Sequence, residues 1–479
     1  MADITLVNMS IAKRFGGKVL FERNSAGMLL LLAALERAGF KPDFHEHFLD
    51  GERSLEEELR RFMALLGASG PIIGIGCHSV HLPFVLKAAE EIKKRFPGKR
   101  VVLGGGGPAP LAAELCRTFD FIDAVAFGEG EETIVEIARR GTKSLKGVKG
   151  LVYREKGKAY ANPPRPPVRD LDKLPLPAYH RMDFEQYEIP TVITSRGCPY
   201  GCHFCSLSAF WGKRVRYRSI DGVMKELRLL AGRHGVKYVF FGDATFIMDR
   251  ERTLELCRRL KKEDLGLKWE CLVRLDRIDE ELMAEMSAAG CEAVFYGLES
   301  GSGNVLRRIK SGFDLPGALA VIRKSARYFR TVEPGMMWGF PFETLADFRE
   351  TLRVREYLKD RLGCEVQLRW LEPYPDTAFF EKYKDTLFLP EGSSAIYSPK
   401  AVAKGLSGGG NFYSAAKGVR KICIPADVTS IRTVVAASHI AALCGPLIRA
   451  YPRLFPDYYR YLTPELEKKL KLARKFCLY

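Results

Sequence analysis

The sequence has no long apolar segment. In its 479 residues no window approaches the roughly 18 consecutive apolar residues of a membrane-spanning helix, so no transmembrane segment is expected. The stretch after Met1 also lacks a signal-peptide pattern, because Asp3, Lys13 and Arg14 interrupt any apolar run. Peripheral contact with a membrane stays open, because the apolar residues 434–448 admit a lipid-facing helix as well as a buried one.

Closely paired cysteines are missing over most of the chain. Of twelve cysteines, three form one close triplet and the other nine are scattered, which does not read as a disulfide framework. We therefore expect a protein of a reducing compartment, the cytoplasm.

Negative charge is in deficit. The chain has 75 Lys and Arg residues against 58 Asp and Glu residues, which gives a net charge of +17. Such an excess favours anionic partners, namely nucleic acid, a membrane surface, or a phosphorylated or carboxylated substrate. The charge is diffuse, however. Its densest segment, Lys468–Lys475, has the periodicity of an amphipathic helix, whose lysines form either a solvated face or a functional patch.

Residues 1–145 alternate apolar strands with amphipathic helices. We expect strands near residues 4–9, 43–48, 72–77, 101–103 and 122–127, and helices near residues 28–37, 55–66, 85–95 and 111–119. This alternation predicts an α/β domain with a parallel, doubly wound (Rossmann-like) sheet, whose ligands bind beyond the carboxyl ends of the strands. Glycine-rich segments fall there, at Gly104–Pro108 and Gly128–Glu132, where missing side chains let the backbone approach a large ligand.

A proline-rich connector over residues 146–190 precedes a second α/β domain, because its prolines cannot continue a helix or a central strand. Over residues 191–390, strands near 191–194, 238–242, 268–273, 293–297, 332–339 and 365–371 alternate with helices. About six β/α units predict an incomplete version of the eightfold barrel. Residues 391–479 are predicted to form a partly helical segment. Its aromatic residues line a substrate pocket or pack on the barrel: Phe412, Tyr413, Tyr458, Tyr459 and Tyr461.

One short loop carries the clearest chemical signal. The stretch Ser195-Arg-Gly-Cys-Pro-Tyr-Gly-Cys-His-Phe-Cys-Ser206 places Cys198, Cys202 and Cys205 in a CxxxCxxC spacing, just after the first predicted barrel strand. Three such thiolates can bind one face of a 4Fe–4S cluster and leave its fourth iron without a protein ligand. Zinc is the alternative, but it normally needs a second ligand pair, and no CxxC or HxxxH partner occurs elsewhere in the sequence.

This loop resembles the cluster-binding loop of the radical S-adenosylmethionine (SAM) superfamily. In that superfamily SAM chelates the open iron and is cleaved reductively to a 5′-deoxyadenosyl radical. The resemblance implies a 4Fe–4S cluster, SAM and an external electron donor such as a flavodoxin or a ferredoxin. It also implies that Phe204, just before the last cysteine, lies beside the adenine of SAM, although Phe204 could simply anchor the loop.

Further stretches at the ends of predicted barrel strands extend the resemblance. They imply that Asp243 contacts SAM or supports the cluster loop, that Arg274 meets the SAM carboxylate or a substrate anion, and that Glu299 binds the ribose hydroxyls. Ser300, beside Glu299, is a further candidate for SAM. Taken singly, each polar residue could equally be a surface ion pair or a strand-end cap. The turn Gly339-Phe-Pro-Phe-Glu-Thr344 resembles a GFPGET sequence, with Phe342 in place of the usual glycine.

The N-terminal part resembles the cobalamin-binding domain of the largest radical SAM class. The resemblance makes cobalamin a probable cofactor, with Ser79, Gly105, Gly106, Gly128 and Glu129 as candidate contacts. The DxHxxG motif of such domains, whose histidine ligates cobalt, is absent. Asp43-Phe-His45 begins like it, but Phe48 occupies the glycine position and the segment lies in the second predicted strand, so His45 and His47 are interpreted as strand side chains.

Together these features favour a cobalamin-dependent methyltransferase that acts on an unactivated carbon. The main alternative is a radical SAM cyclase, oxidoreductase or rearrangement enzyme in which cobalamin is absent or does not transfer methyl groups. A tRNA methylthiotransferase is disfavoured, because such enzymes usually carry a second cysteine triplet, and only Cys77 and Cys116 precede this loop. The substrate is expected to be a small molecule, a lipid or a peptide, and nucleic acid is not expected.

Overall fold

The computed structural model describes residues 2–388 and 444–475, apart from residues 11, 16–17, 24, 50–52, 310–311, 456–458 and 462. The described residues divide into two compact units. One contains most of the chain up to Tyr187, and the other is built mainly from residues 188–388 together with the residues from Tyr461 on.

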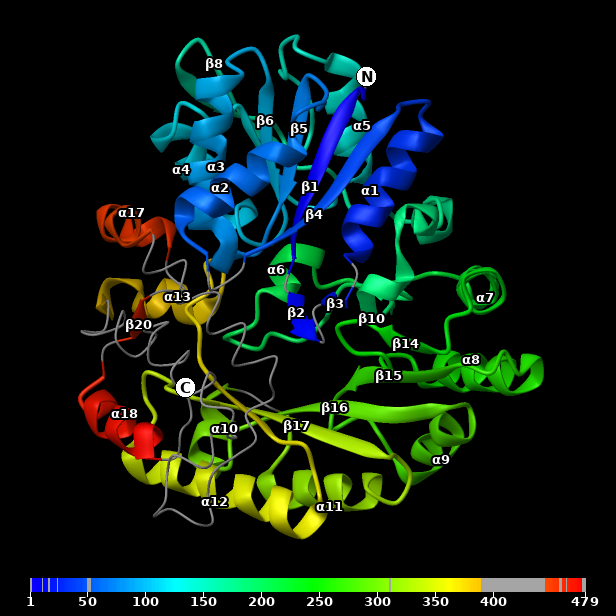
Figure 1. Ribbon diagram of the computed structural model, residues 1–479. Helices are drawn as coiled ribbons and strands as arrows, with labels where there is room; N and C mark the ends of the chain where they lie inside the picture. The colour runs from blue at the N-terminus through cyan, green and yellow to red at the C-terminus, as the bar shows by residue number, and fades with distance from the viewer. Residues whose placement is uncertain are drawn as a thin grey trace. The chain divides into compact units, whose positions relative to one another are not determined.

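The N-terminal unit has the predicted doubly wound sheet (Figure 1). Its parallel strands lie in the order β4 (Pro42–Phe48), β1 (Ile4–Ser10), β5 (Ile72–Gly76), β6 (Arg100–Gly104) and β7 (Ala124–Ala126). The helices are α1 (Ala26–Arg37), α2 (Leu55–Leu65), α3 (Leu82–Arg95), α4 (Ala112–Thr118) and α5 (Glu131–Arg140). The strands form where apolar residues run continuously, as in the buried segment Ile72–Gly76, because helices cover both faces of such a sheet. Helix α5 was not predicted.

Part of the expected connector belongs to this sheet. Strands β8 (Leu151–Glu155) and β9 (Lys158–Ala161) form an antiparallel hairpin that continues the sheet beyond β7, where the sequence analysis predicted only a proline-rich link over residues 146–190. Lys156 and Gly157 connect them with φ of 49° and 78°, the sign that a two-residue type I′ hairpin turn requires at both positions. A second unpredicted hairpin joins β2 (Ala12–Phe15) to β3 (Lys18–Arg23).

The second unit contains the six predicted β/α units. Its six-stranded sheet has the order β11 (Thr191–Val192), β14 (Tyr238–Phe241), β15 (Lys268–Val273), β16 (Cys291–Glu299), β17 (Thr331–Trp338) and β18 (Gln367–Trp370). All five strand pairs are parallel. Helices α7 (Ile220–Arg228), α8 (Arg250–Glu263), α9 (Glu280–Ala288), α10 (Gly303–Ile309), α11 (Leu315–Ser325) and α12 (Leu345–Leu362) alternate with the strands. The partial barrel is therefore confirmed, and the carboxyl ends of its strands lie along one edge.

Helix α18 (Leu466–Lys475) packs against this partial barrel. Its Ala473 is completely buried in a cluster with Trp338 of β17 and with Phe348 and Leu352 of α12. The basic segment of the sequence is thus helical as predicted. One of its lysines does not lie on a solvated face, because Lys469 has 0% of its side chain exposed.

Shorter elements of the described chain include β10 (Tyr187–Ile189), α6 (Leu207–Trp211), α13 (Ala378–Tyr383), β19 (Leu387–Phe388), α17 (Gly445–Ala450) and β20 (Arg460–Tyr461). The aromatic residues Phe412, Tyr413 and Tyr458 of the expected C-terminal segment lie outside the described residues. Tyr459 is 8% exposed and Tyr461 is 2% exposed, and Tyr461 packs with Phe340 and Phe379 on the barrel.

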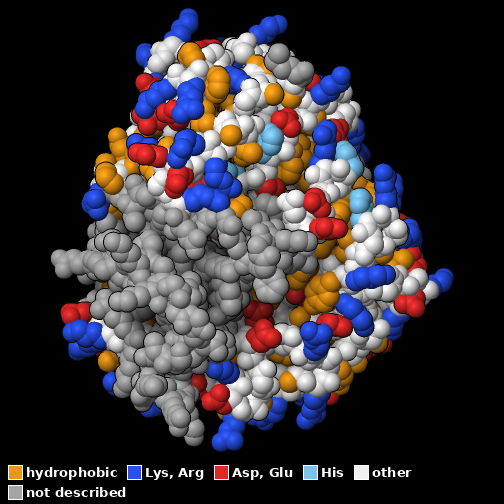
Figure 2. Space-filling model, in the orientation of Figure 1, with side chains coloured by type: hydrophobic (Ala, Val, Ile, Leu, Met, Phe, Trp, Pro, Cys, Tyr) orange, Lys and Arg blue, Asp and Glu red, His pale blue; other side chains and the backbone are white. Residues whose placement is uncertain are grey.

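On the face in Figure 2, basic and acidic side chains are interspersed. Among the described residues, no helix combines the length and the apolar character needed to cross a bilayer.

A short hairpin sets the start of the cysteine loop. Strand β12 (Ser195–Arg196) pairs antiparallel with β13 (Arg216–Tyr217), so the intervening residues form a closed loop. Gly197, the first residue of that loop, has a φ of 107°, and a Cβ added there would overlap the carbonyl oxygen of Arg214. Glycine is therefore required at position 197 for two independent reasons.

We predict that Gly197→Ala destabilises the hairpin by about 1–3 kcal/mol, because the left-handed backbone is strained for any residue with a Cβ. The readouts are the melting temperature and the rate of limited proteolysis within residues 197–215. Gly201→Ala in the same loop is the control, because no atom lies within 4 Å of the added Cβ and its φ is not in the left-handed region. Equal behaviour of the two variants would contradict the prediction.

Candidate active site

The three cysteines of the CxxxCxxC spacing share one loop at the carboxyl edge of the barrel sheet. Cys198, Cys202 and Cys205 are free and partly exposed, whereas the other described cysteines are buried. The Cys198 N–H donates to the Gly212 carbonyl at 3.1 Å, and the Cys205 N–H donates to the Cys202 carbonyl at 3.2 Å. Backbone hydrogen bonds therefore shape the loop.

Burial raises the pKa of the Cys205 thiol to about 11 and also raises the pKa of Cys202, which the positive charge of Arg274 opposes. Binding of iron would thus release protons from these thiols. Within the described residues, no three His, Cys, Asp or Glu side chains are placed to hold a single metal ion.

Glu299 ends β16 in a strained conformation. Its φ is 69°, in the left-handed region that a residue with a Cβ rarely adopts, and the pairing register with β17 shifts between Gly297 and Glu299. A Cβ at position 297 would overlap Oε1 of Glu299, so Gly297 makes room for this carboxylate. Burial raises the pKa of Glu299 to about 7, and the charge of Arg274 works in the opposite direction.

Arg274 is tied to the cysteine loop. Its guanidinium lies 3.7 Å from the ring centroid of Tyr200, a residue between the first two cysteines, and Nε of Arg277 donates to the Tyr200 hydroxyl at 2.7 Å. The bidentate fork of Arg274 faces Asp276, with N–O distances of 2.8 and 2.9 Å. From the sequence, Arg274 was expected to meet the SAM carboxylate or a substrate anion, and a contact with SAM stays a prediction.

Asp243 lies at the end of β14 and is 1% exposed. Its Oδ1 accepts hydrogen bonds from the backbone N–H groups of Thr194 (2.7 Å) and Ser195 (3.0 Å), and its Oδ2 accepts one from the Thr194 hydroxyl. Burial raises its pKa, and the hydrogen bonds from Thr194 lower it. Both oxygens are thus used to hold the residues that lead into the cysteine loop.

The remaining predicted SAM residues face the protein interior. Ser300 is completely buried, and its hydroxyl bonds Thr351 of α12 at 2.9 Å and accepts from the Ser302 N–H at 3.1 Å. Phe204 is partly buried and meets the ring of Phe340 edge to face, with 6.4 Å between the centroids. It joins the cysteine loop to the barrel core.

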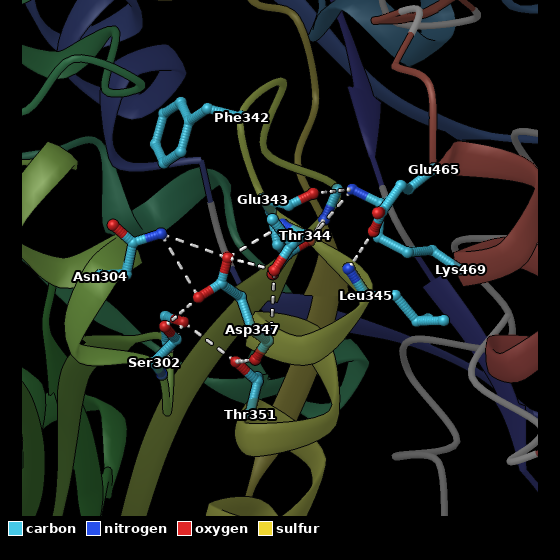
Figure 3. A network of polar contacts seen from close by, with 12 residues as sticks. Ser302, Asn304, Phe342, Glu343, Thr344, Leu345, Asp347, Thr351, Glu465 and Lys469 are labelled. Atoms are coloured by element: carbon cyan, nitrogen blue, oxygen red, sulfur yellow. Dashed lines mark hydrogen bonds and ion pairs between the residues drawn. The ribbon is translucent and has the colours of Figure 1, made fainter.

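The turn after β17 is the most densely bonded part of the edge (Figure 3). Gly339 has a φ of 88°, and its N–H donates to Oε2 of Glu343 at 2.7 Å. Thr344 then caps α12 in a capping box with Asp347, which also accepts from the Ser302 hydroxyl at 2.6 Å. Phe342, at the position where glycine was expected, packs its ring under the guanidinium of Arg308 at 4.0 Å.

Sequence reasoning missed the partners that hold this turn, namely Asp347, Thr351, Glu465 and Lys469. The T-x-x-D spacing of Thr344 and Asp347 was an available signal for the cap. The buried position of Lys469 also had a signal in the sequence, because this lysine falls on the apolar stripe of its helix between Leu466 and Ala473.

In the N-terminal unit, Gly76 and Gly104 are paired, so the loops after β5 and β6 begin side by side. A Cβ on Gly105, whose φ is 95°, would lie 2.8 Å from the Cys77 carbonyl oxygen, so this glycine is needed for packing. In contrast, a Cβ on Gly106 or Gly128 would meet no atom of the described residues within 4 Å. These two positions therefore offer open backbone at the edge where ligands of doubly wound sheets bind.

The other predicted cobalamin contacts, Ser79 and Glu129, are part of local structure. Ser79 begins a short 3₁₀ helix, Ser79–His81, and is partly exposed. Glu129 is 7% exposed, and its Oε2 accepts from the Val168 N–H at 2.7 Å, so it holds the proline-rich connector.

His45 and His47 are strand side chains, as the sequence analysis interpreted them, because β4 spans Pro42–Phe48. Nε2 of His45 lies 2.9 Å from Oδ2 of Asp43. His47 is 3% exposed and stacks on Phe84, with 5.6 Å between the ring centroids.

Two family models match the chain. Residues 192–354 match the model of the radical SAM superfamily, and residues 14–138 match the model of the B12 binding domain. The first range contains the cysteine loop and Glu299, and the second contains the glycine-rich loop after β6.

Several curated proteins are similar to this chain in sequence. An uncharacterized methyltransferase of Pyrococcus horikoshii is 32% identical over 305 residues, which cover 62% of this chain and 65% of the relative. An anaerobic magnesium-protoporphyrin IX monomethyl ester cyclase of Rubrivivax gelatinosus is 27% identical, over 63% of this chain and 57% of the relative. A cytidylyl-2-hydroxyethylphosphonate methyltransferase of Streptomyces wedmorensis is 29% identical, over 59% and 62%. The chain thus spans less than two thirds of each of these relatives.

Two solved structures share the fold. The radical SAM methyltransferase TsrM of Kitasatospora setae, with cobalamin and a [4Fe-4S] cluster bound, has a TM-score of 0.63 at 18% identity and covers 80% of this chain and 78% of its own. The cobalamin-dependent SAM radical enzyme OxsB, with aqua-cobalamin bound, has a TM-score of 0.65 at 17% identity and covers 99% and 75%. Both models are matched in the predicted order and the cysteine triplet lies inside residues 192–354, so this chain carries a B12-binding domain followed by a domain of the radical SAM superfamily.

Proposed function

We propose that this chain is a cobalamin-dependent radical SAM methyltransferase that modifies an unactivated carbon. The observation that carries the proposal is the set of three partly exposed cysteines on one loop, at the strand ends where Glu299 also lies. Methyltransferases among the relatives support methyl transfer.

Cys198, Cys202 and Cys205 would hold three irons of a 4Fe–4S cluster. Their partial exposure and the hydrogen-bonded shape of their loop support this assignment. When bound, such a cluster with its open iron supplies the electron for reductive cleavage of SAM. An external donor such as a flavodoxin or a ferredoxin would deliver that electron.

Glu299 would accept the ribose hydroxyl hydrogens of SAM, because an ionised carboxylate is a pure acceptor with room for two donors. Arg274 would hold the cysteine loop through Tyr200 and place positive charge near Cys202. Asp243 would support the start of the loop, since its oxygens already accept three hydrogen bonds. Phe204 would stand beside the adenine, and Ser300 would orient the segment that bears Glu299.

Cobalamin would bind at the carboxyl edge of the N-terminal sheet. The bare backbone at Gly106 and Gly128 fits a large planar ligand, and Ser79, Gly105 and Glu129 would complete or support that edge. When bound, cobalamin supplies the methyl group that is transferred. His45 lies within β4, paired with Asp43, which supports a site without the DxHxxG histidine.

A second candidate is radical cyclisation. It is favoured by the relatives that are magnesium-protoporphyrin IX monomethyl ester cyclases, one of which matches 79% of this chain at 24% identity. The same cysteine loop and Glu299 would serve either reaction up to the cleavage of SAM.

Cys202→Ala is expected to abolish cluster binding, because the two remaining cysteines cannot replace the three thiolate ligands of the cluster. Iron and sulfide are measured after anaerobic reconstitution. Cys364→Ala is the control, because Cys364 is a buried cysteine outside the loop, and it should keep wild-type iron content. Full iron content in Cys202→Ala would refute the ligand assignment.

Glu299→Gln is expected to raise the Kd for SAM about tenfold or more, since hydrogen bonds to a charged group contribute about 1.5–3 kcal/mol. Because burial raises the pKa of Glu299 to about 7, the carboxylate is ionised above that pH and protonated below it. SAM affinity of the wild type should therefore fall as the pH is lowered from about 8 to about 6, and the Glu299→Gln variant should lose this dependence. Glu292→Gln, at the other end of β16, is the matched control. A pH-independent wild type would count against the ribose role.

The methyltransferase proposal is tested by anaerobic reconstitution with iron, sulfide and hydroxocobalamin, followed by corrinoid analysis and reduction in the presence of SAM. We expect retained corrinoid together with release of 5′-deoxyadenosine. Release of 5′-deoxyadenosine by a protein that retains no corrinoid would exclude cobalamin-dependent methyl transfer and favour cyclisation.

A further inference from the structure

Lys469 of α18 is a completely buried lysine that no part of the proposed chemistry uses. Its Nζ donates to the backbone carbonyl of Glu343 at 3.1 Å and lies 3.4 Å from Oε2 of the same residue. Both side chains have 0% exposure. Figure 3 shows Lys469 reaching from α18 to the turn between β17 and α12.

Packing alone does not call for a lysine at this position. The neighbouring positions of the same helix face, Leu466 and Ala473, are 3% and 0% exposed. An apolar side chain would continue this face without removing an ammonium group from water, which is costly even when the charge is paired. The lysine therefore serves its local partner rather than the general stability of the helix.

Its partner Glu343 closes the turn. The same Oε2 accepts the Gly339 N–H at 2.7 Å, so one carboxylate joins the first residue of the turn to α18. Burial raises the pKa of Glu343 and lowers the pKa of Lys469, while their mutual attraction opposes both shifts.

The residue just before α18 also binds the residue on the far side of the turn. The carboxylate of Glu465, one helical turn before Lys469, accepts a hydrogen bond from the Leu345 N–H. The turn is thus held on both sides of Thr344, by Lys469 of α18 and by Glu465 just before that helix.

The other face of the turn leads to the cysteine loop. Phe342 precedes Glu343 and stacks on Phe340, with 5.8 Å between the ring centroids, and Phe340 contacts Phe204 of the loop. The loop is also anchored nearby, where the Phe379 N–H donates to the His203 carbonyl at 3.0 Å. A shift of the turn would therefore move the aromatic residues that pack against Phe204.

We propose that Lys469 is a positioning residue for SAM: through Glu343 it fixes the Gly339–Thr344 turn, and with it the aromatic side chains against the cysteine loop, in the geometry that binds and cleaves SAM. This inference rests on the proposed function. It adds α18, which follows the turn by more than a hundred residues, to the SAM site.

The test compares three reconstituted full-length variants: Lys469→Met, the double variant Lys469→Met/Glu343→Gln, and the control Lys471→Met. The amide oxygen introduced by Glu343→Gln can still accept the Gly339 N–H, so the double variant removes only the tether to α18 and leaves no unpaired charge from this pair. Lys471 is an exposed lysine of the same helix, paired with Glu467 at 2.8 Å. Iron content, melting temperature, Kd for SAM and the SAM-induced change in the EPR spectrum of the reduced cluster are measured for each.

We expect both Lys469 variants to keep wild-type iron content, to bind SAM about tenfold more weakly or worse, and to cleave it up to about a hundredfold more slowly, since a displacement of about 1 Å can have that effect. Lys471→Met should match the wild type. Unchanged SAM binding and cleavage in the double variant, with only a lower melting temperature, would overturn the inference. If the variants do not fold, hydrogen exchange on the wild type tests the inference instead. SAM should then protect residues 339–345 and 466–473 together, and protection of residues 339–345 alone would overturn the inference. Failure of the wild type to cleave SAM would instead overturn the proposed function.

Discussion

The buried carboxylate of Asp243 is the interaction on which the cysteine loop depends. It accepts hydrogen bonds from the backbone N–H groups of Thr194 and Ser195, which follow β11 and lie outside its parallel pairing with β14. Burying a carboxylate to 1% exposure is costly unless donors such as these N–H groups satisfy it. The aspartate and the backbone of Thr194 and Ser195 therefore stabilise each other. The loop therefore starts from a rigid edge, which three thiolates that must meet one cluster require.

Much of the architecture could be predicted from the sequence. Continuous apolar runs separated by amphipathic segments identified the parallel strands of both units, because a sheet covered on both faces leaves that pattern. The CxxxCxxC spacing was recognised in the sequence itself, and Glu299 was assigned through the resemblance to the radical SAM superfamily. The structure places Glu299 at the end of β16. The β8–β9 hairpin was missed because prolines dominate the segment around it, and the short turn at Lys156 and Gly157 carries a weaker signal.

What the sequence could not predict is mostly a matter of long-range partners. Nothing near Asp243 in the chain indicates that its oxygens are used by Thr194 and Ser195. The φ of 69° at Glu299 follows from a register shift between neighbouring strands, which no local pattern encodes. Such features arise only when distant segments are packed, and they concentrate at the candidate site.

The link between Glu343 and Lys469 has a consequence for the order in which the site is completed. Glu343 leaves the ribosome 126 residues before Lys469, so the nascent chain exposes the cysteine loop and all six barrel strands while the turn still lacks its anchor. During that interval the carboxylate faces water, and the ion pair that will bury it does not exist. A chain that ended before α18 would therefore contain the cysteine loop and all six barrel strands but leave the turn without its anchor.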